Sequence, residues 1–141
     1  MFNPSRADAR RMFFDAWRKH RERLPLAGLE ALVVDVMLQH AEYHAMLDDP
    51  EHYMDRDFTP ESGDTNPFLH MSLHLAIEEQ LSIDQPPGIK ARYRQILNRC
   101  GSPHDAQHVV MECLAEMIWQ SQRNNAAPDG VAYLECLDKR R

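Results

Sequence analysis

The chain has 141 residues, of which 43% are hydrophobic and 27% charged, and its formal net charge is −6. This length suits one domain with its own core, and no apolar run approaches the ~18 residues of a membrane-spanning helix. The opening MFNPSRADARR lacks the apolar segment of a secretory signal, so we expect a cytoplasmic protein. The three cysteines, Cys100, Cys113 and Cys136, show no CxxC spacing, which favours reduced thiols over a disulfide framework.

Charge is unevenly distributed along the chain. Residues 1–25 carry seven basic side chains against three acidic ones, although the whole chain is acidic. Asn3-Pro4-Ser5 is expected to open a basic N-terminal helix and Pro25 to end it. Such a helix can bind a nucleic acid or an acidic partner, or it can pack against the acidic remainder of its own chain. The basic residues form no long stripe and no RNA-binding signature follows, so we favour internal packing.

A second helix is predicted over residues 26–47, because apolar residues recur there every three to four positions. His40 and His44 fall near the centre of its apolar stripe, so both imidazoles are expected to face the core. Residues 48–65 break this pattern. They form an acidic stretch with two prolines and a glycine, and we expect a long loop with one short turn around residues 51–54.

A third helix is predicted over residues 66–81. Asn66 is a suitable N-cap, and Pro67 suits the first helical position, where no backbone donor is lost. His70 and His74 share one face of this helix with apolar residues. Because buried imidazoles need partners, these two side chains raise the question of what satisfies them.

Three more helices complete the predicted fold. Residues 89–99 form a short basic helix, which Gly101 ends. A long helix follows to about residue 123, with Ser102 as its N-cap, and a final helix begins at Pro128. Every long segment shows the helical period and none alternates as a strand does. The sequence therefore predicts an all-α bundle of about five to six helices in a single domain, residues 1–141.

Three predicted helices each carry two histidines at HxxxH spacing, namely His40/His44, His70/His74 and His104/His108. Residues four apart lie on one face of a helix, about 6 Å apart along its axis, so both imidazoles can bind one ion or two neighbouring ions. With eight histidines in the chain, chance spacing predicts roughly 0.4 such pairs. The excess favours a metal site over satisfied core histidines.

Two of these pairs extend by one turn to a carboxylate, Glu78 after His74 and Glu112 after His108. Imidazole and carboxylate ligands from facing helices are how helical bundles hold metals. We expect Fe, Zn or Mn, although Cu and Ni are also compatible with imidazole ligands. The core helices lack ExxH, so the ferritin-like pattern does not apply. The candidate metal ligands are His40, His44, His70, His74, His104, His108, Glu78 and Glu112, with His104 at the mouth of the site.

Three stretches carry a resemblance to a known family: FNPSR at the start, NPFLHMSLHLAIEEQLSIDQPPGI in the middle, and HDAQHVVMECLAEMIW later. Together they resemble the family catalogued as domain of unknown function 1841, and LSIDQPPGI is the most specific part. The resemblance spans nearly the whole chain. It implies a small, single-domain bacterial protein and brings no established activity.

Two functions remain open from the sequence. The first is a metal-binding bundle, as an oxidase, a hydrolase or a metal-handling protein, in which Glu112 or Glu78 takes a proton from metal-bound water. The second is a non-enzymatic interaction module, whose buried histidines pair with tyrosines and carboxylates and whose basic first helix binds a partner. We expect no membrane partner, find no strong nucleic-acid signal, and leave a homo-oligomer open. The sequence names no substrate.

Overall fold

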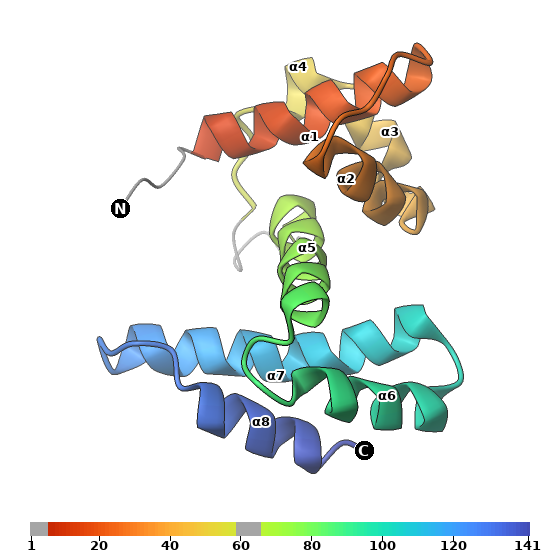
Figure 1. Ribbon diagram of the computed structural model, residues 1–141. Helices are drawn as coiled ribbons and strands as arrows, with labels where there is room; N and C mark the ends of the chain where they lie inside the picture. The colour runs from red at the N-terminus through yellow and green to blue at the C-terminus, as the bar shows by residue number, and fades with distance from the viewer. Residues whose placement is uncertain (1–5, 59–65) are drawn as a thin grey trace. The chain divides into compact units, whose positions relative to one another are not determined.

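The computed structural model describes residues 6–58 and 66–141. Over these ranges it holds eight α-helices, one short 3₁₀ helix and no strand, so the predicted all-α class is confirmed but the helix count was too low. In chain order (Figure 1) the elements are α1 (Arg6–Arg21), α2 (Leu29–Leu38), η1 (Ala41–Tyr43), α3 (His44–Leu47), α4 (Pro50–Tyr53), α5 (Pro67–Ile83), α6 (Ile89–Cys100), α7 (Pro103–Arg123) and α8 (Gly130–Asp138).

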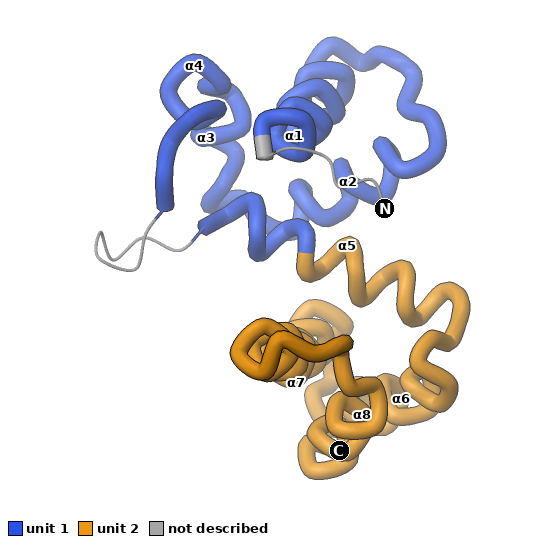
Figure 2. The backbone as a smooth tube through the Cα atoms, turned by 90° about the vertical axis from the view of Figure 1, so that its left-hand side faces the viewer, with its two compact units in different colours: residues 1–72 blue, residues 73–141 orange. Residues whose placement is uncertain are grey.

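The chain forms two compact units, Met1–Ser72 and Leu73–Arg141, and the boundary falls within α5 (Figure 2). Each unit has its own core and is described by itself. The expectation of a single domain over residues 1–141 stays a prediction. The predicted opening Asn3-Pro4-Ser5 and part of the predicted acidic loop lie outside the described residues. Within that loop, α4 forms where the short turn was expected.

Several helix ends follow the local signals in the sequence. The Asn66 side chain accepts the backbone N–H groups of Phe68 and Leu69 at the start of α5. Ser102 caps α7 in the same way, and Gly101 ends α6 with φ of 78°. No helix within the described ranges is both long and apolar enough to span a bilayer.

The single helix predicted over residues 26–47 is wrong, because the chain leaves the helical conformation at His40, where φ is −127° and ψ is 69°. The His40 side chain supplies the reason. Its Nδ1 lies 2.7 Å from the carbonyl oxygen of Val36, the acceptor that the His40 backbone N–H would use in a continuing helix. That backbone N–H instead donates to Met37 O, at 3.0 Å. The side chain thus replaces a helical hydrogen bond and ends α2.

The first unit has an aromatic core around Phe68, at the start of α5. The rings of Phe13 and Phe14 lie 6.1 and 5.6 Å from it, centroid to centroid. Arg10 is 3% exposed, and its guanidinium carbon lies 4.5 Å from the centre of the Phe68 ring. Its Nη1 donates to three backbone carbonyls at the end of α4 and just after it, those of Tyr53, Met54 and Arg56, at 3.2, 3.0 and 2.7 Å. One buried cation therefore fixes the segment that leaves α4.

Four other basic side chains of α1 have acidic partners in the first unit. These ion pairs are Arg11–Asp8, Arg18–Glu22, Lys19–Glu30 and Arg21–Asp48. Two of the pairs, Lys19–Glu30 and Arg21–Asp48, join α1 to acidic residues elsewhere in the first unit, as expected for a basic helix that packs against its own chain, whereas the other two are local to α1. Most of them are exposed, so each adds little to stability.

The second unit is built from the C-terminal half of α5 with α6, α7 and α8. Its fully buried core is apolar and comprises Ile77, Ile89, Ile96, Ala106, Val110, Cys113, Leu114, Tyr133 and Leu137. The prediction of three reduced thiols is wrong for two of them, because a disulfide joins Cys113 of α7 to Cys136 of α8. Cys100 is a free thiol. The pairing was missed because the two cysteines lie on different helices, 23 residues apart in the sequence.

We predict that Arg10→Met destabilises the protein by about 3 kcal/mol, because it leaves three backbone carbonyls near a buried site without their donor. Arg11→Met is the matched control, since Arg11 makes an exposed ion pair on the same helix. It should change the free energy of unfolding by no more than about 0.5 kcal/mol. Urea denaturation followed by circular dichroism measures both values. Equal effects of the two substitutions would contradict a structural role for Arg10.

The Asp84 side chain stabilises the start of α6 through hydrogen bonds. Its carboxylate accepts the backbone N–H groups of Lys90 and Gly88, at 3.0 and 3.3 Å, and these bonds lower the pKa of the Asp84 carboxyl. A lowered pKa contributes stability above the ordinary value of about 3.9, and that contribution is lost as the pH falls through the lowered pKa.

We therefore predict that Asp84→Asn lowers the melting temperature at pH 7 and that the gap to the wild type shrinks below about pH 4. Asp84 has φ of 52°, a conformation that asparagine also tolerates, so the substitution tests the charge rather than the backbone. Thermal melts at pH 3, 5 and 7 measure the gap. A gap of constant size over this range would rule out the charge as its cause.

Candidate metal centre

Two of the candidate ligands lie on adjacent turns of α7. Ser102 and Pro103 start the helix, so His104 occupies its first turn and His108 the second. Their rings lie 4.3 Å apart, centroid to centroid, and are nearly perpendicular, at 80°. The local sequence thus places two imidazoles on one face of α7, as the HxxxH spacing predicts.

His74 of α5 completes a group of three within the second unit. Its ring lies 4.9 Å from that of His108 and 5.8 Å from that of His104, where the two rings stack at 16°. Each of the three offers a ring nitrogen, and these nitrogens all lie within 4.8 Å of one another. The shortest separation, 3.2 Å, joins Nε2 of His74 to Nε2 of His108. His74 is 1% exposed, whereas His104 and His108 are half-buried.

A chain of hydrogen bonds orients His74. Its Nδ1 lies 2.8 Å from Oε1 of Gln107, and Nε2 of Gln107 donates to the carboxylate of Glu78. A carboxylate only accepts, so the amide nitrogen must face Glu78 and the amide oxygen must face His74. That oxygen also only accepts, so Nδ1 of His74 carries the hydrogen. In the neutral ring, Nε2 therefore holds the lone pair, and this atom faces His108.

The separation of the two Nε2 atoms suits a shared metal ion. Nitrogens bound to one ion at about 2.1 Å lie about 3.0 Å apart in octahedral geometry and about 3.4 Å apart in tetrahedral geometry. The observed 3.2 Å lies between these values. Three imidazoles would leave at least one coordination position open, as in catalytic zinc sites. A water in that position would become more acidic, and a substrate oxygen there would be polarised.

The two predicted carboxylate ligands have other partners. Glu78 lies one hydrogen bond beyond Gln107, so it supports the orientation of His74 through the amide. Glu112 forms an ion pair with Arg140 at the end of α8, and its side chain is 62% exposed. Helical spacing placed both residues one turn after a histidine, but it could not reveal these partners from other parts of the chain.

His40 and His44 lie in the first unit, and both bind the last turn of α2. His40 donates through Nδ1 to Val36 O, and His44 donates through Nε2 to Met37 O, each at 2.7 Å. The His44 ring also packs on Trp17, at 4.6 Å between centroids. This HxxxH pair therefore caps a helix end, where carbonyl groups lack backbone donors.

His70 also lies in the first unit, on α5. Its Nδ1 is 2.7 Å from the hydroxyl of Tyr43, and its ring meets that of His40 edge-on at 4.8 Å. Burial raises the pKa of the Tyr43 phenol, which keeps it protonated and able to donate at neutral pH. A tyrosine partner is the arrangement expected for a structurally satisfied histidine.

Gln107 is the one residue of this arrangement that the sequence analysis missed. It lies on α7 between Ala106 and His108, and its side chain is buried. A signal was present in the sequence. Gln107 falls on the apolar stripe of α7, three residues before Val110, and a polar side chain at a core position needs a polar partner.

We compared the chain with known proteins. No curated protein and no solved structure matched it. The model of a family described as a domain of unknown function (DUF1841) matches residues 5–139, which include every residue of the histidine group and of the hydrogen-bonded chain behind it. The sequence resemblance is thereby confirmed, and the chain belongs to the DUF1841 family.

Proposed function

We propose that this protein binds a divalent transition metal through His74, His104 and His108. The observation that carries the proposal is the orientation of His74, whose lone pair at Nε2 faces Nε2 of His108 at 3.2 Å. Gln107 and Glu78 hold this orientation as supporting groups commonly hold a histidine ligand. Imidazole ligands favour Zn, Fe, Cu or Ni over Mn, which prefers carboxylates and water, so zinc and iron are the favoured ions.

The alternative is a plain hydrogen bond between the rings, with Nε2 of His108 donating to Nε2 of His74. This arrangement corresponds to the second function left open by the sequence, a non-enzymatic interaction module whose histidines make hydrogen bonds within the protein. It involves only His74 and His108. The closeness of all three rings favours the metal.

Three histidine ligands are compatible with a catalytic metal, and also with a metal that the protein only carries. Its open position can accept water or a substrate oxygen, and half-buried His104 lies where solvent reaches the group. Glu112 is no longer proposed as the proton acceptor because Arg140 holds it. We favour a metal-dependent hydrolase or oxidase in the cytoplasm, and a metal-handling role is the second possibility.

Three other histidines were predicted as ligands from the sequence. His44 is left out, since its Nε2 donates to the Met37 carbonyl. His40 and His70 belong to the first unit, and the sequence-based prediction that they add ligands to the second unit's group stays a prediction. Zinc titration of His40→Gln and His70→Gln tests it, since a true ligand should lower zinc affinity when it is replaced.

We predict that zinc binds the wild-type protein at about one ion per chain and that His74→Gln or His108→Gln lowers the affinity by roughly a hundredfold or more. Bound zinc should stabilise the fold by about 2.7 kcal/mol at a free concentration a hundred times Kd, because it binds only the folded arrangement. Isothermal titration calorimetry and thermal melts measure the two effects.

His52→Gln is the matched control for that experiment. His52 lies on the surface of α4 and pairs with Asp49, so its loss should leave zinc affinity unchanged. His104→Gln separates the two readings. It should weaken zinc binding as strongly as the other ligand substitutions if the metal site is real. Equal zinc affinity in His104→Gln, His74→Gln and His52→Gln would overturn the proposal.

We further predict that Gln107→Leu lowers zinc affinity by about 10–100-fold, although Gln107 is not a proposed ligand, because His74 loses the acceptor that fixes its tautomer. Glu78→Gln keeps an acceptor oxygen for the Gln107 amide and should lower the affinity by less than about tenfold. Titration of both variants with Co²⁺, followed by its visible absorption, reports affinity and geometry together. A Gln107→Leu variant with unchanged affinity and spectrum would show that the hydrogen-bonded chain plays no part.

A further inference from the structure

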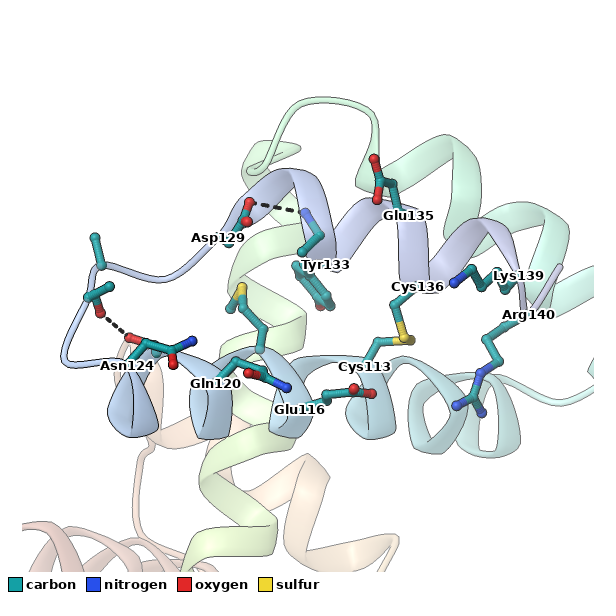
Figure 3. Close-up of a pocket in the computed structure, with 15 residues that line it drawn as sticks. Cys113, Glu116, Gln120, Asn124, Asp129, Tyr133, Glu135, Cys136, Lys139 and Arg140 are labelled. Atoms are coloured by element: carbon teal, nitrogen blue, oxygen red, sulfur yellow. Dashed lines mark hydrogen bonds between the residues drawn. A yellow bond between two sulfur atoms is a disulfide. The ribbon is translucent and has the colours of Figure 1, made fainter.

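The second unit contains a cavity of about 570 Å³ between α7 and α8 (Figure 3), and no member of the histidine group lines it. Its walls are one face of each helix, the loop that joins them and the residues that follow α8. On α7 the lining residues include Cys113, Glu116 and Gln120, and on α8 they include Tyr133 and Cys136. A cavity of this volume is in the range that holds a small molecule.

The disulfide between Cys113 and Cys136 crosses this cavity wall (Figure 3). Its two cysteines differ in exposure, because Cys113 is 1% exposed whereas Cys136 is half-buried. An attacking thiolate needs access to a sulfur, so we assign the attack to Cys136, the more exposed residue. Disulfides that form in a reducing compartment are usually transient and take part in catalysis or redox sensing.

Charges around the cavity are arranged along its length. Lys139 and Arg140 lie three and four residues after Cys136, one helical turn further, and Figure 3 shows both at the disulfide end. Asp129 and Asn124 lie at the other end. Arg140 forms an ion pair with Glu112, and the carboxylates of Glu116 and Glu135 also line the cavity. We therefore assign the binding of a ligand carboxylate near the disulfide to Lys139.

We propose that the Cys113–Cys136 pair is a redox-active disulfide that reacts with a low-molecular-weight peptide thiol bound in this cavity. Such a thiol carries a carboxylate for Lys139 and amides for the polar wall. This inference is independent of the proposed metal site.

The exchange proceeds in two balanced steps. The thiolate of the peptide attacks Sγ of Cys136, the disulfide breaks, and Sγ of Cys113 leaves with the bonding electron pair and takes a proton from solvent. A second peptide thiolate then attacks the peptide sulfur of this mixed disulfide and releases Cys136 as a thiolate. Two peptide thiols are thereby oxidised to one disulfide, and the protein disulfide is reduced to two thiols. The reverse reaction reoxidises the protein.

We predict that reduced glutathione, used as the probe, converts the folded protein from one alkylatable cysteine to three without loss of its helical circular dichroism. Cys100 is the free thiol that gives the starting value. Glutathione is then removed at low pH, and iodoacetamide labelling in denaturant followed by intact-protein mass spectrometry counts the thiols, buried Cys113 included. A disulfide that glutathione reduces only after denaturation would overturn the proposal.

The two single-cysteine variants test which sulfur is attacked. In a Cys100→Ser background, Cys113→Ser leaves Cys136 at the cavity and should form a mixed disulfide with oxidised glutathione. Cys136→Ser leaves buried Cys113 and should form it at least about tenfold more slowly, because thiol reactivity requires access. Equal rates for the two variants would contradict the assignment. Circular dichroism confirms that both are folded.

Charge recognition is tested with Lys139→Gln, and Arg141→Gln is its matched control. Arg141 is a neighbouring cation that pairs with Asp138 and does not line the cavity. Lys139→Gln should slow reduction by glutathione roughly threefold or more, whereas reduction by uncharged 2-mercaptoethanol should not change. Arg141→Gln should leave both rates unchanged. Rates that respond to neither substitution would overturn the recognition of a carboxylate in the cavity.

Discussion

The candidate metal centre depends on the hydrogen-bonded chain from His74 through Gln107 to Glu78. Each member has one possible role in that chain, because a carboxylate and an amide oxygen only accept and an amide nitrogen only donates. These two hydrogen bonds therefore determine which ring nitrogen of His74 keeps its lone pair. Without them, the ring could flip or change tautomer, and the same three histidines would form a polar cluster with no defined direction. Gln107 and Glu78 thus indicate the role of His74 as much as its own position does.

The same HxxxH spacing has different structural consequences in the two units. In α7 it places two imidazoles on one face of a continuous helix, beside a third from α5. At His40 and His44 the imidazoles bind the free carbonyls at the end of α2 and so help to terminate the helix that the spacing was thought to extend. The interpretation of HxxxH as two ligands on one face holds only where the helix is continuous. Side chains that bind the backbone carbonyls can end the helix between the two histidines.

The parts of the fold that the sequence predicted are those governed by local chemistry. Asn66 and Gly101 act through groups a few residues away, so the start of α5 and the end of α6 were found where expected. The pairing of Cys113 with Cys136 and the ion pair of Glu112 depend instead on which helices meet, and no spacing along one helix contains that information. Gln107 stands between the two cases: its polarity on an apolar stripe was visible, but its partners were not.

We propose that the three-histidine group of the second unit holds a metal. Elemental analysis of the protein, purified without a polyhistidine tag or chelating resin, is the decisive measurement. The account predicts close to one zinc or iron ion per chain, and a large loss of that metal when His74 is replaced by glutamine in protein prepared in the same way. Metal-free protein that also fails to bind added zinc would contradict the account. The histidines would then be hydrogen-bonding partners alone.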